Sequence, residues 1–82
     1  MGYKRKKELD PEVSKFLKEF GSRLVKLRKA KGYSNYENFA YDHNLPRAQY
    51  GIYERGTVDM RFSILFRLAT AHGISVSELL DF

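Results

Sequence analysis

The sequence predicts an all-α domain of five helices joined by short connections. Apolar residues recur three and four positions apart in several segments, which is the spacing of one face of a helix. Ser-x-x-Glu patterns begin at Ser34 and at Ser75, and such patterns are typical of helix starts. No segment alternates apolar and polar residues for long enough to predict a strand. With 82 residues, the chain has room for a single domain, which we expect to span residues 10–82.

The first predicted helix follows Asp10 and Pro11, a capping residue and a proline at the first helical position. Gly32 is expected to end this helix. Gly21 lies inside it and is expected to weaken it slightly, because glycine has a low helix propensity. Its apolar residues form one stripe along the helix: Val13, Phe16, Leu17, Phe20, Leu24 and Leu27.

The second and third helices are both predicted to be short. Ser34 and Glu37 form a capping box that is expected to open the second helix. Asn44, a residue that tolerates the left-handed conformation, is expected to end it. Pro46 fits the first position of the third helix, and Gly56 is expected to close that helix near residue 55.

The fourth helix is predicted to end at Gly73, and a second capping box at Ser75 and Glu78 is expected to start a short fifth helix. His43 and His72 fall near the C-terminal ends of predicted helices. A protonated histidine interacts favourably with the helix dipole there, so we expect both to be helix-end residues and not ligands or catalysts. The fourth helix carries five apolar residues: Phe62, Leu65, Phe66, Leu68 and Ala69.

The composition argues against several classes of protein. Hydrophobic residues make up 43% of the chain, which is too much for a disordered chain. Two histidines and no cysteine make a disulfide impossible and a metal site unexpected. No apolar run approaches the roughly 18 residues of a membrane span, so we expect a soluble cytoplasmic protein. No nucleophile lies at a suggestive spacing from a base, so we expect neither an enzyme nor a cofactor.

The positive charge is concentrated at the N-terminal end. Residues 1–31 contain eleven Lys or Arg and four acidic residues, whereas residues 32–82 contain four and six. This asymmetry suggests a polyanionic partner such as nucleic acid, although a solvated helix face with a basic tail would give the same pattern. Residues 1–9 are expected to form a flexible basic arm, which carries Lys4, Arg5, Lys6 and Lys7.

The third helix has an inner and an outer side. Tyr50 and Tyr53 lie three apart and are expected to face inward together with Leu45. The major groove of DNA admits a helix, and an outward Ile52 would suit a thymine methyl there, unless it is one more scattered apolar surface residue. The outer side is expected to carry Arg47, Ala48, Gln49 and Ile52.

Residues 24–82 resemble the phage repressor and Cro family of helix-turn-helix proteins, often called the XRE family. The resemblance implies a five-helix, lambda-repressor-like domain with the helix-turn-helix at helices two and three. It also implies a sequence-specific transcription regulator of double-stranded DNA, and the small controllers of restriction-modification systems are one group of similar length. The matching stretches are Arg23 to Ser34, Phe39-Ala40, Asn44-Leu45, Tyr53 to Gly56, and Leu65 to Leu80.

The resemblance also implies roles for individual residues. Arg28 and Glu54 align with an ion pair that joins the first helix to the third, and Asn35 aligns with a residue that holds the DNA backbone. We expect base contacts from Arg47, Ala48, Ile52 and the neighbouring Gln49. Further phosphate contacts are expected from Arg55, Arg61, Lys4, Arg5, Lys6 and Lys7.

Three residues depart from the family's pattern. Asn44 stands where the turn usually has glycine, and Pro46 stands where a serine or threonine usually caps the recognition helix, so that helix is expected to start within about one residue of Pro46. Gly51 inside the recognition helix costs about 1 kcal/mol relative to alanine. It would permit either a close backbone approach or some adjustability of the helix.

A homodimer is expected, because one short helix covers too few base pairs to be specific. Two copies related by a two-fold axis would read a palindromic operator with half-site centres about 34 Å apart. The expected dimer surface is the C-terminal segment, which has more apolar residues than a terminal helix needs, although some must fill the core: Ile74, Val76, Leu79, Leu80 and Phe82.

Two other functions fit the same sequence features. An antitoxin would bind DNA and also a toxin partner. A helical module that binds a protein or an RNA would not bind duplex DNA, so a titration with mixed duplexes would separate it from the first two.

Overall fold

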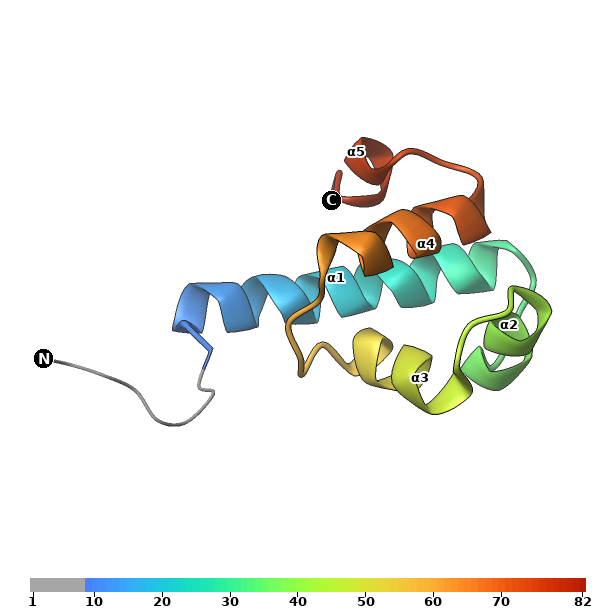
Figure 1. The fold of residues 1–82 in the computed structure, drawn as a ribbon, viewed down its shortest axis with the longest axis horizontal. Helices are drawn as coiled ribbons and strands as arrows, with labels where there is room; N and C mark the ends of the chain where they lie inside the picture. Colours follow the sequence, from blue (N-terminus) through green and yellow to red (C-terminus); the bar gives the residue numbers. More distant parts are fainter. Residues whose placement is uncertain (1–8) are drawn as a thin grey trace, which may run out of the picture.

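The computed structural model describes residues 9–82, which form five helices and contain no strand, as the sequence predicts (Figure 1). None of the helices within these residues is both long and apolar enough to cross a membrane. The predicted basic arm, with Lys4, Arg5, Lys6 and Lys7, falls almost entirely outside the described residues. The helices are α1 (Pro11–Ala30), α2 (Tyr36–Asp42), α3 (Arg47–Arg55), α4 (Phe62–His72) and α5 (Val76–Leu79).

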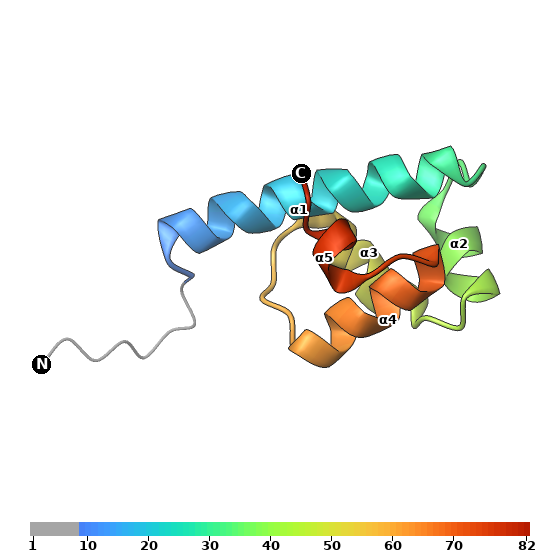
Figure 2. The same cartoon turned by 90° about the horizontal axis from the view of Figure 1, so that it is seen from above.

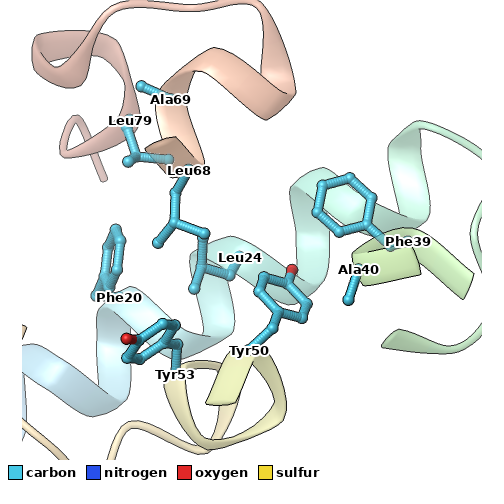
Figure 3. Close-up of a cluster of buried hydrophobic side chains, with 9 residues drawn as sticks. All are labelled: Phe20, Leu24, Phe39, Ala40, Tyr50, Tyr53, Leu68, Ala69 and Leu79. Atoms are coloured by element: carbon cyan, nitrogen blue, oxygen red, sulfur yellow. The ribbon is translucent and has the colours of Figure 1, made fainter. Parts of the chain in front are cut away.

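A single cluster of buried side chains holds the five helices together (Figure 3). Each helix contributes at least one member, and several members are completely shielded from solvent. Burying a large apolar side chain stabilises a fold by about 1.5–3 kcal/mol, so this cluster is the main source of stability. Its members are Phe20, Leu24, Phe39, Ala40, Tyr50, Tyr53, Leu68, Ala69 and Leu79.

The first turns of α1 extend beyond the rest of the molecule (Figures 1 and 2). The apolar stripe of α1 is therefore buried from Leu17 to Leu24 and partly buried at Leu27, whereas Val13 and Phe16 are 40% and 45% exposed. Phe16 is covered in part by Phe82, whose ring centroid lies 5.1 Å away. The N-terminal end of the stripe thus contributes to a surface patch rather than to the core.

Two glycines allow the backbones of α1 and α3 to cross at close range. A Cβ atom on Gly21 would collide with the carbonyl oxygen of Glu54, and one on Gly56 would lie 2.5 Å from the carbonyl oxygen of Leu17. Gly56 also has a φ of 69°, which glycine adopts without strain. Gly21 therefore does more than weaken α1, because its missing side chain lets the end of α3 pack against it.

The helix ends follow the sequence predictions with two corrections. The predicted capping box at Ser34 and Glu37 is wrong, because the side chain of Asn35 caps α2 and accepts a hydrogen bond from the backbone of Asn38 at 2.9 Å. Pro46 is the N-cap of α3 rather than its first residue, so α3 begins one residue later than expected.

The remaining predicted boundaries are present. Asp10 caps α1, the capping box of Ser75 and Glu78 opens α5, and Gly73 ends α4 with a φ of 68°. Asn44 has a φ of 60°, so asparagine does adopt the left-handed turn where the family pattern has glycine.

The surface apolar residues of the C-terminal half differ from the expected set. Leu79 is completely buried in the core, so its predicted place in a dimer surface is wrong: it already packs inside its own monomer. Ile74, Val76 and Leu80 are partly buried against the same core, and Phe82 is 48% exposed. Two residues of α4 are more exposed still, namely Phe62 at 63% and Phe66 at 58%.

Candidate nucleic-acid interface

The turn between α2 and α3 is held in place by backbone and side-chain hydrogen bonds. The backbone of Leu45 donates to the carbonyl of Ala40 at 2.8 Å, which closes the turn directly after α2. The guanidinium of Arg67, on α4, donates to the carbonyl of Asn44 at 3.1 Å. Because the turn is tied both to α2 and to α4, α3 leaves it in a fixed direction.

The inner face of α3 is anchored in the core. Tyr50 is 1% exposed and Tyr53 is 9% exposed, and the ring of Tyr50 lies 5.3 Å from the ring of Phe39. Leu45 packs partly buried against the same cluster. The predicted inward set is therefore confirmed.

The outer face of α3 carries the residues that the sequence predicts to read DNA. Arg47, Ala48 and Gln49 are exposed, and Ile52 is partly buried. Arg47 and Gln49 make no side-chain hydrogen bond to another residue of the 9–82 segment, so their polar groups point to solvent with free donors and acceptors. These four residues, the base-reading row, thus combine polar and apolar side chains on one short helix.

An ion pair fixes the other end of α3 to α1. The guanidinium of Arg28 donates two hydrogen bonds to the carboxylate of Glu54, at 2.8 and 3.0 Å, and a third to the carbonyl of Tyr33 at 3.0 Å. Their side chains are only 8% and 7% exposed. The hydrogen bonds to Glu54 raise the pKa of Arg28, and burial raises the pKa of the neighbouring Tyr50. Arg28 therefore forms a buried, bidentate ion pair with α3 and is not one more exposed cation of a basic helix.

Three of the residues predicted to contact phosphates, Asn35, Arg55 and Arg61, lie in the described part of the chain, between the start of α2 and the start of α4, whereas Lys4, Arg5, Lys6 and Lys7 lie outside it. The side chain of Asn35 is exposed, and its carbonyl oxygen is used for capping, which leaves its amide hydrogens available. Arg55 is the last residue of α3 and Arg61 is the N-cap of α4, and both are exposed. The two arginines therefore flank the loop between these helices.

Tyr36 is a residue that the sequence analysis missed. It is the first residue of α2, and its ring fills the space above Gly51 of α3. A Cβ atom on Gly51 would lie 2.7 and 2.8 Å from two ring carbons of Tyr36. The close approach that Gly51 permits is thus to an aromatic side chain, rather than to a backbone. An aromatic residue beside a helix cap, with a glycine in the facing helix, was the available signal.

Both histidines lie at helix ends as expected, but the reason expected for His72 is wrong. His43 caps α2, with its Nδ1 atom 2.8 Å from the carbonyl oxygen of Phe39, and His72 is the last residue of α4. Burial lowers the pKa of His72 to about 4, and its ring stacks on Phe39 at 4.8 Å. His72 is therefore uncharged at neutral pH, and the dipole argument for its position is wrong. Within residues 9–82, no three His, Cys, Asp or Glu side chains come together as metal ligands would.

A short exposed helix, fixed by a tight turn to a second short helix and buried on its inner face, defines a helix-turn-helix protein. No protein-family model matches the chain, and no curated protein matches it. A solved structure does: the crystal structure of the restriction-modification controller protein C.AhdI from Aeromonas hydrophila has 34% sequence identity and a TM-score of 0.70. The match covers 85% of this chain and 99% of that chain. The chain therefore belongs to the helix-turn-helix family of transcription regulators that includes this controller protein.

Proposed function

We propose that the protein is a sequence-specific regulator of transcription, of the restriction-modification controller type, that reads the major groove of duplex DNA with α3. The observation that carries the proposal is the contrast on α3 between a buried inner face and an outer face with free polar groups. A helix presented in this way from a fixed turn fits the major groove. The 34% identity to a controller protein supports the same function.

Four side chains are proposed to contact bases. The fork of Arg47 suits the two acceptors on the major-groove edge of a guanine, and the amide of Gln49 suits an adenine. Ala48 and Ile52 are apolar and suit the methyl group of a thymine. Together they offer both hydrogen-bond and apolar readout within two turns of one helix.

Other polar groups are proposed to hold the DNA backbone and so to fix the register of α3. The candidates in the described residues are Asn35, Arg55 and Arg61, all of which are exposed. Lys4, Arg5, Lys6 and Lys7 are proposed to add affinity for phosphates without choosing a sequence.

A homodimer is proposed because one helix of nine residues covers too few base pairs to be specific, whereas two copies related by a two-fold axis would read both halves of a palindromic operator. In Figure 1, α5 lies at the upper edge of the molecule and α3 at the lower edge, with α4 between them, and the two overlap in the view from above (Figure 2). An interface on the far side of α5 would therefore turn the two copies of α3 away from each other. The C-terminal segment is therefore the weaker candidate for the dimer surface, although it carries the apolar residues Ile74, Val76, Leu80 and Phe82.

The exposed side of α4 is the better candidate for the dimer surface. α4 borders the molecule on the side away from α1 (Figure 2), and in Figure 1 it lies between α5 and α3. Phe62 and Phe66 lie one helical turn apart on it, with ring centroids 5.8 Å apart, and both are more than half exposed. We propose that these two rings pack against the same pair of a second copy.

Sedimentation of charge-matched variants tests this surface. Replacing Phe62 and Phe66 by serine is expected to give a monomer with unchanged helix content, because neither ring belongs to the core. The control is Phe82→Ser, which removes an exposed ring elsewhere and should leave the dimer intact. If Phe82→Ser were a monomer and the Phe62/Phe66 double variant remained a dimer, the interface would be assigned to the C-terminal segment. If the parent and all variants were monomers, both free and on DNA, a homodimer would be excluded.

Selection from a pool of random duplexes tests the function itself. The parent protein is expected to enrich a palindrome whose half-site centres are about 34 Å apart. Enrichment of no sequence would contradict the proposed function.

A further inference from the structure

We propose that Tyr36 is a positioning residue for base reading: its ring, seated on Gly51, sets the distance between α2 and the recognition helix α3. This inference rests on the proposed function, because it assigns to a contact between two helices a role in choosing DNA sequence. Neither residue belongs to the base-reading row of Arg47, Ala48, Gln49 and Ile52.

The contact between Tyr36 and Gly51 is close. Tyr36 is partly buried at the start of α2, and its ring centroid lies 6.4 Å from that of the fully buried Tyr50. A Cβ atom on Gly51 would lie within 3 Å of two ring carbons and 3.1 Å from the hydroxyl oxygen. Ring and helix are thus packed so closely that no side chain larger than glycine's fits at position 51 without displacing Tyr36.

The helix propensity of Gly51 supports a role for this contact. Glycine in the middle of a helix is less stable than alanine, and Gly51 has a helical neighbourhood that alanine could adopt. The sequence therefore has a residue of low helix propensity at a position of α3 that lies directly against the ring of Tyr36. Packing of the Tyr36 ring against Gly51 offsets this loss of helix stability.

The base-reading residues lie on both sides of this seat. Ile52 is adjacent to Gly51 in the chain, and Arg47 lies one helical turn before it. If α3 moved away from α2, both side chains would move with it. Contacts to base edges need groups held to within about 0.5 Å, so a displacement by part of a ring's thickness would impair base reading. Backbone contacts and the general attraction of positive charge would be affected much less.

A double-mutant cycle tests the proposal by measuring two affinities for each variant, one for the selected operator and one for a random duplex. Gly51→Ala is expected to weaken operator binding about tenfold or more, as expected when one bidentate base contact is removed, and random binding by less than about twofold. In a Tyr36→Ala background, the same Gly51→Ala change is expected to cost less than about twofold, because the ring that collides with the new methyl group is gone.

Two controls separate positioning from other roles. Tyr36→Phe keeps the ring and is expected to bind the operator within about twofold of the parent. Tyr33→Ala removes another partly buried tyrosine, which packs on Phe39 at 5.3 Å and is not in contact with Gly51, and should leave the ratio of operator to random affinity unchanged. Melting curves of each variant show that the folded protein is being compared.

The outcomes separate this inference from the function on which it rests. Equal costs of Gly51→Ala in both backgrounds, equal losses on operator and random DNA, or a Tyr36→Phe loss as large as that of Gly51→Ala would each overturn the positioning role. A parent protein that prefers no sequence at all would overturn the proposed function and the positioning role with it.

Discussion

The inner and outer faces of α3 differ in almost every physical respect. The inner face is buried, and the buried carboxylate of Glu54, near its end, has each oxygen hydrogen-bonded to Arg28. The outer face exposes Arg47, Ala48 and Gln49, with no such partner in the described part of the chain for the two polar ones. One helix of nine residues thus has one side held by the core and one side whose polar groups are exposed to solvent.

The difference explains how so short a helix can serve as a reading element. A helix of this length is marginal by itself in water, so its conformation depends on packing. The contacts of the inner face supply that packing, and the outer face is then free to keep polar groups for a partner. Changes on the inner face should therefore alter stability, and changes on the outer face should alter recognition.

The largest expected effect is on the inner face, at Glu54. Glu54→Gln leaves the charge of Arg28 buried without its partner, which is expected to cost about 3–5 kcal/mol and to lower the melting temperature by more than about 10 °C. The control is Glu37→Gln, which removes an exposed carboxylate and should change stability by less than about 0.5 kcal/mol. An unchanged melting temperature for Glu54→Gln would show that the ion pair does not hold α3.

A somewhat smaller effect is expected from pH, through His72. The pKa of His72 is lowered to about 4 in the folded protein from its ordinary value of 6.5, so between these values the unfolded chain binds more protons. Stability should therefore fall as the pH falls from about 6.5 to 4, by up to about 3 kcal/mol. Denaturant titrations across this range should show a flatter pH dependence for His72→Phe. Parallel curves for the parent and the variant would exclude His72 as the cause.

Removal of residues 1–7 should change DNA binding and not stability. Operator and random duplexes should be bound more weakly by similar factors, and the slope of log affinity against log salt should decrease by about 0.9 for each phosphate that the arm no longer neutralises. The melting temperature should stay the same. A truncated protein that selects a different consensus would instead show that the arm reads a groove.

The elements that local sequence determines were the predictable ones. The capping box at Ser75 and Glu78 and the left-handed glycines at the ends of α3 and α4 can be recognised from neighbouring residues, and all are present. The predicted start of α2 was one residue too early, because Ser34 and Asn35 are both good N-cap residues. Which of them caps the helix depends on the path by which the chain leaves α1.

The features that depend on packing between distant segments were not predictable. Leu79 and Phe82 are three residues apart and both apolar, yet one fills the core and the other is half exposed. The fourth helix has more apolar residues than its inner face can bury, and the pattern does not say that Phe62 and Phe66 are the ones left outside. Likewise, the contact between Tyr36 and Gly51 requires knowing that α2 and α3 meet at those residues.

The most direct test of the account is a selection of random duplexes with Arg47→Ala and Arg55→Ala, two variants that lose the same charge from opposite ends of α3. Arg47→Ala is expected to lose the preference at one base pair of each half-site, a discrimination of about 1–3 kcal/mol, with an unchanged melting temperature. Arg55→Ala is expected to keep the parent consensus, and its affinity for every sequence is expected either to fall by about the same factor or to stay the same. If Arg47→Ala returned the parent consensus and merely bound more weakly, Arg47 would be a phosphate contact, and the claim that the start of α3 reads bases through this arginine would be contradicted.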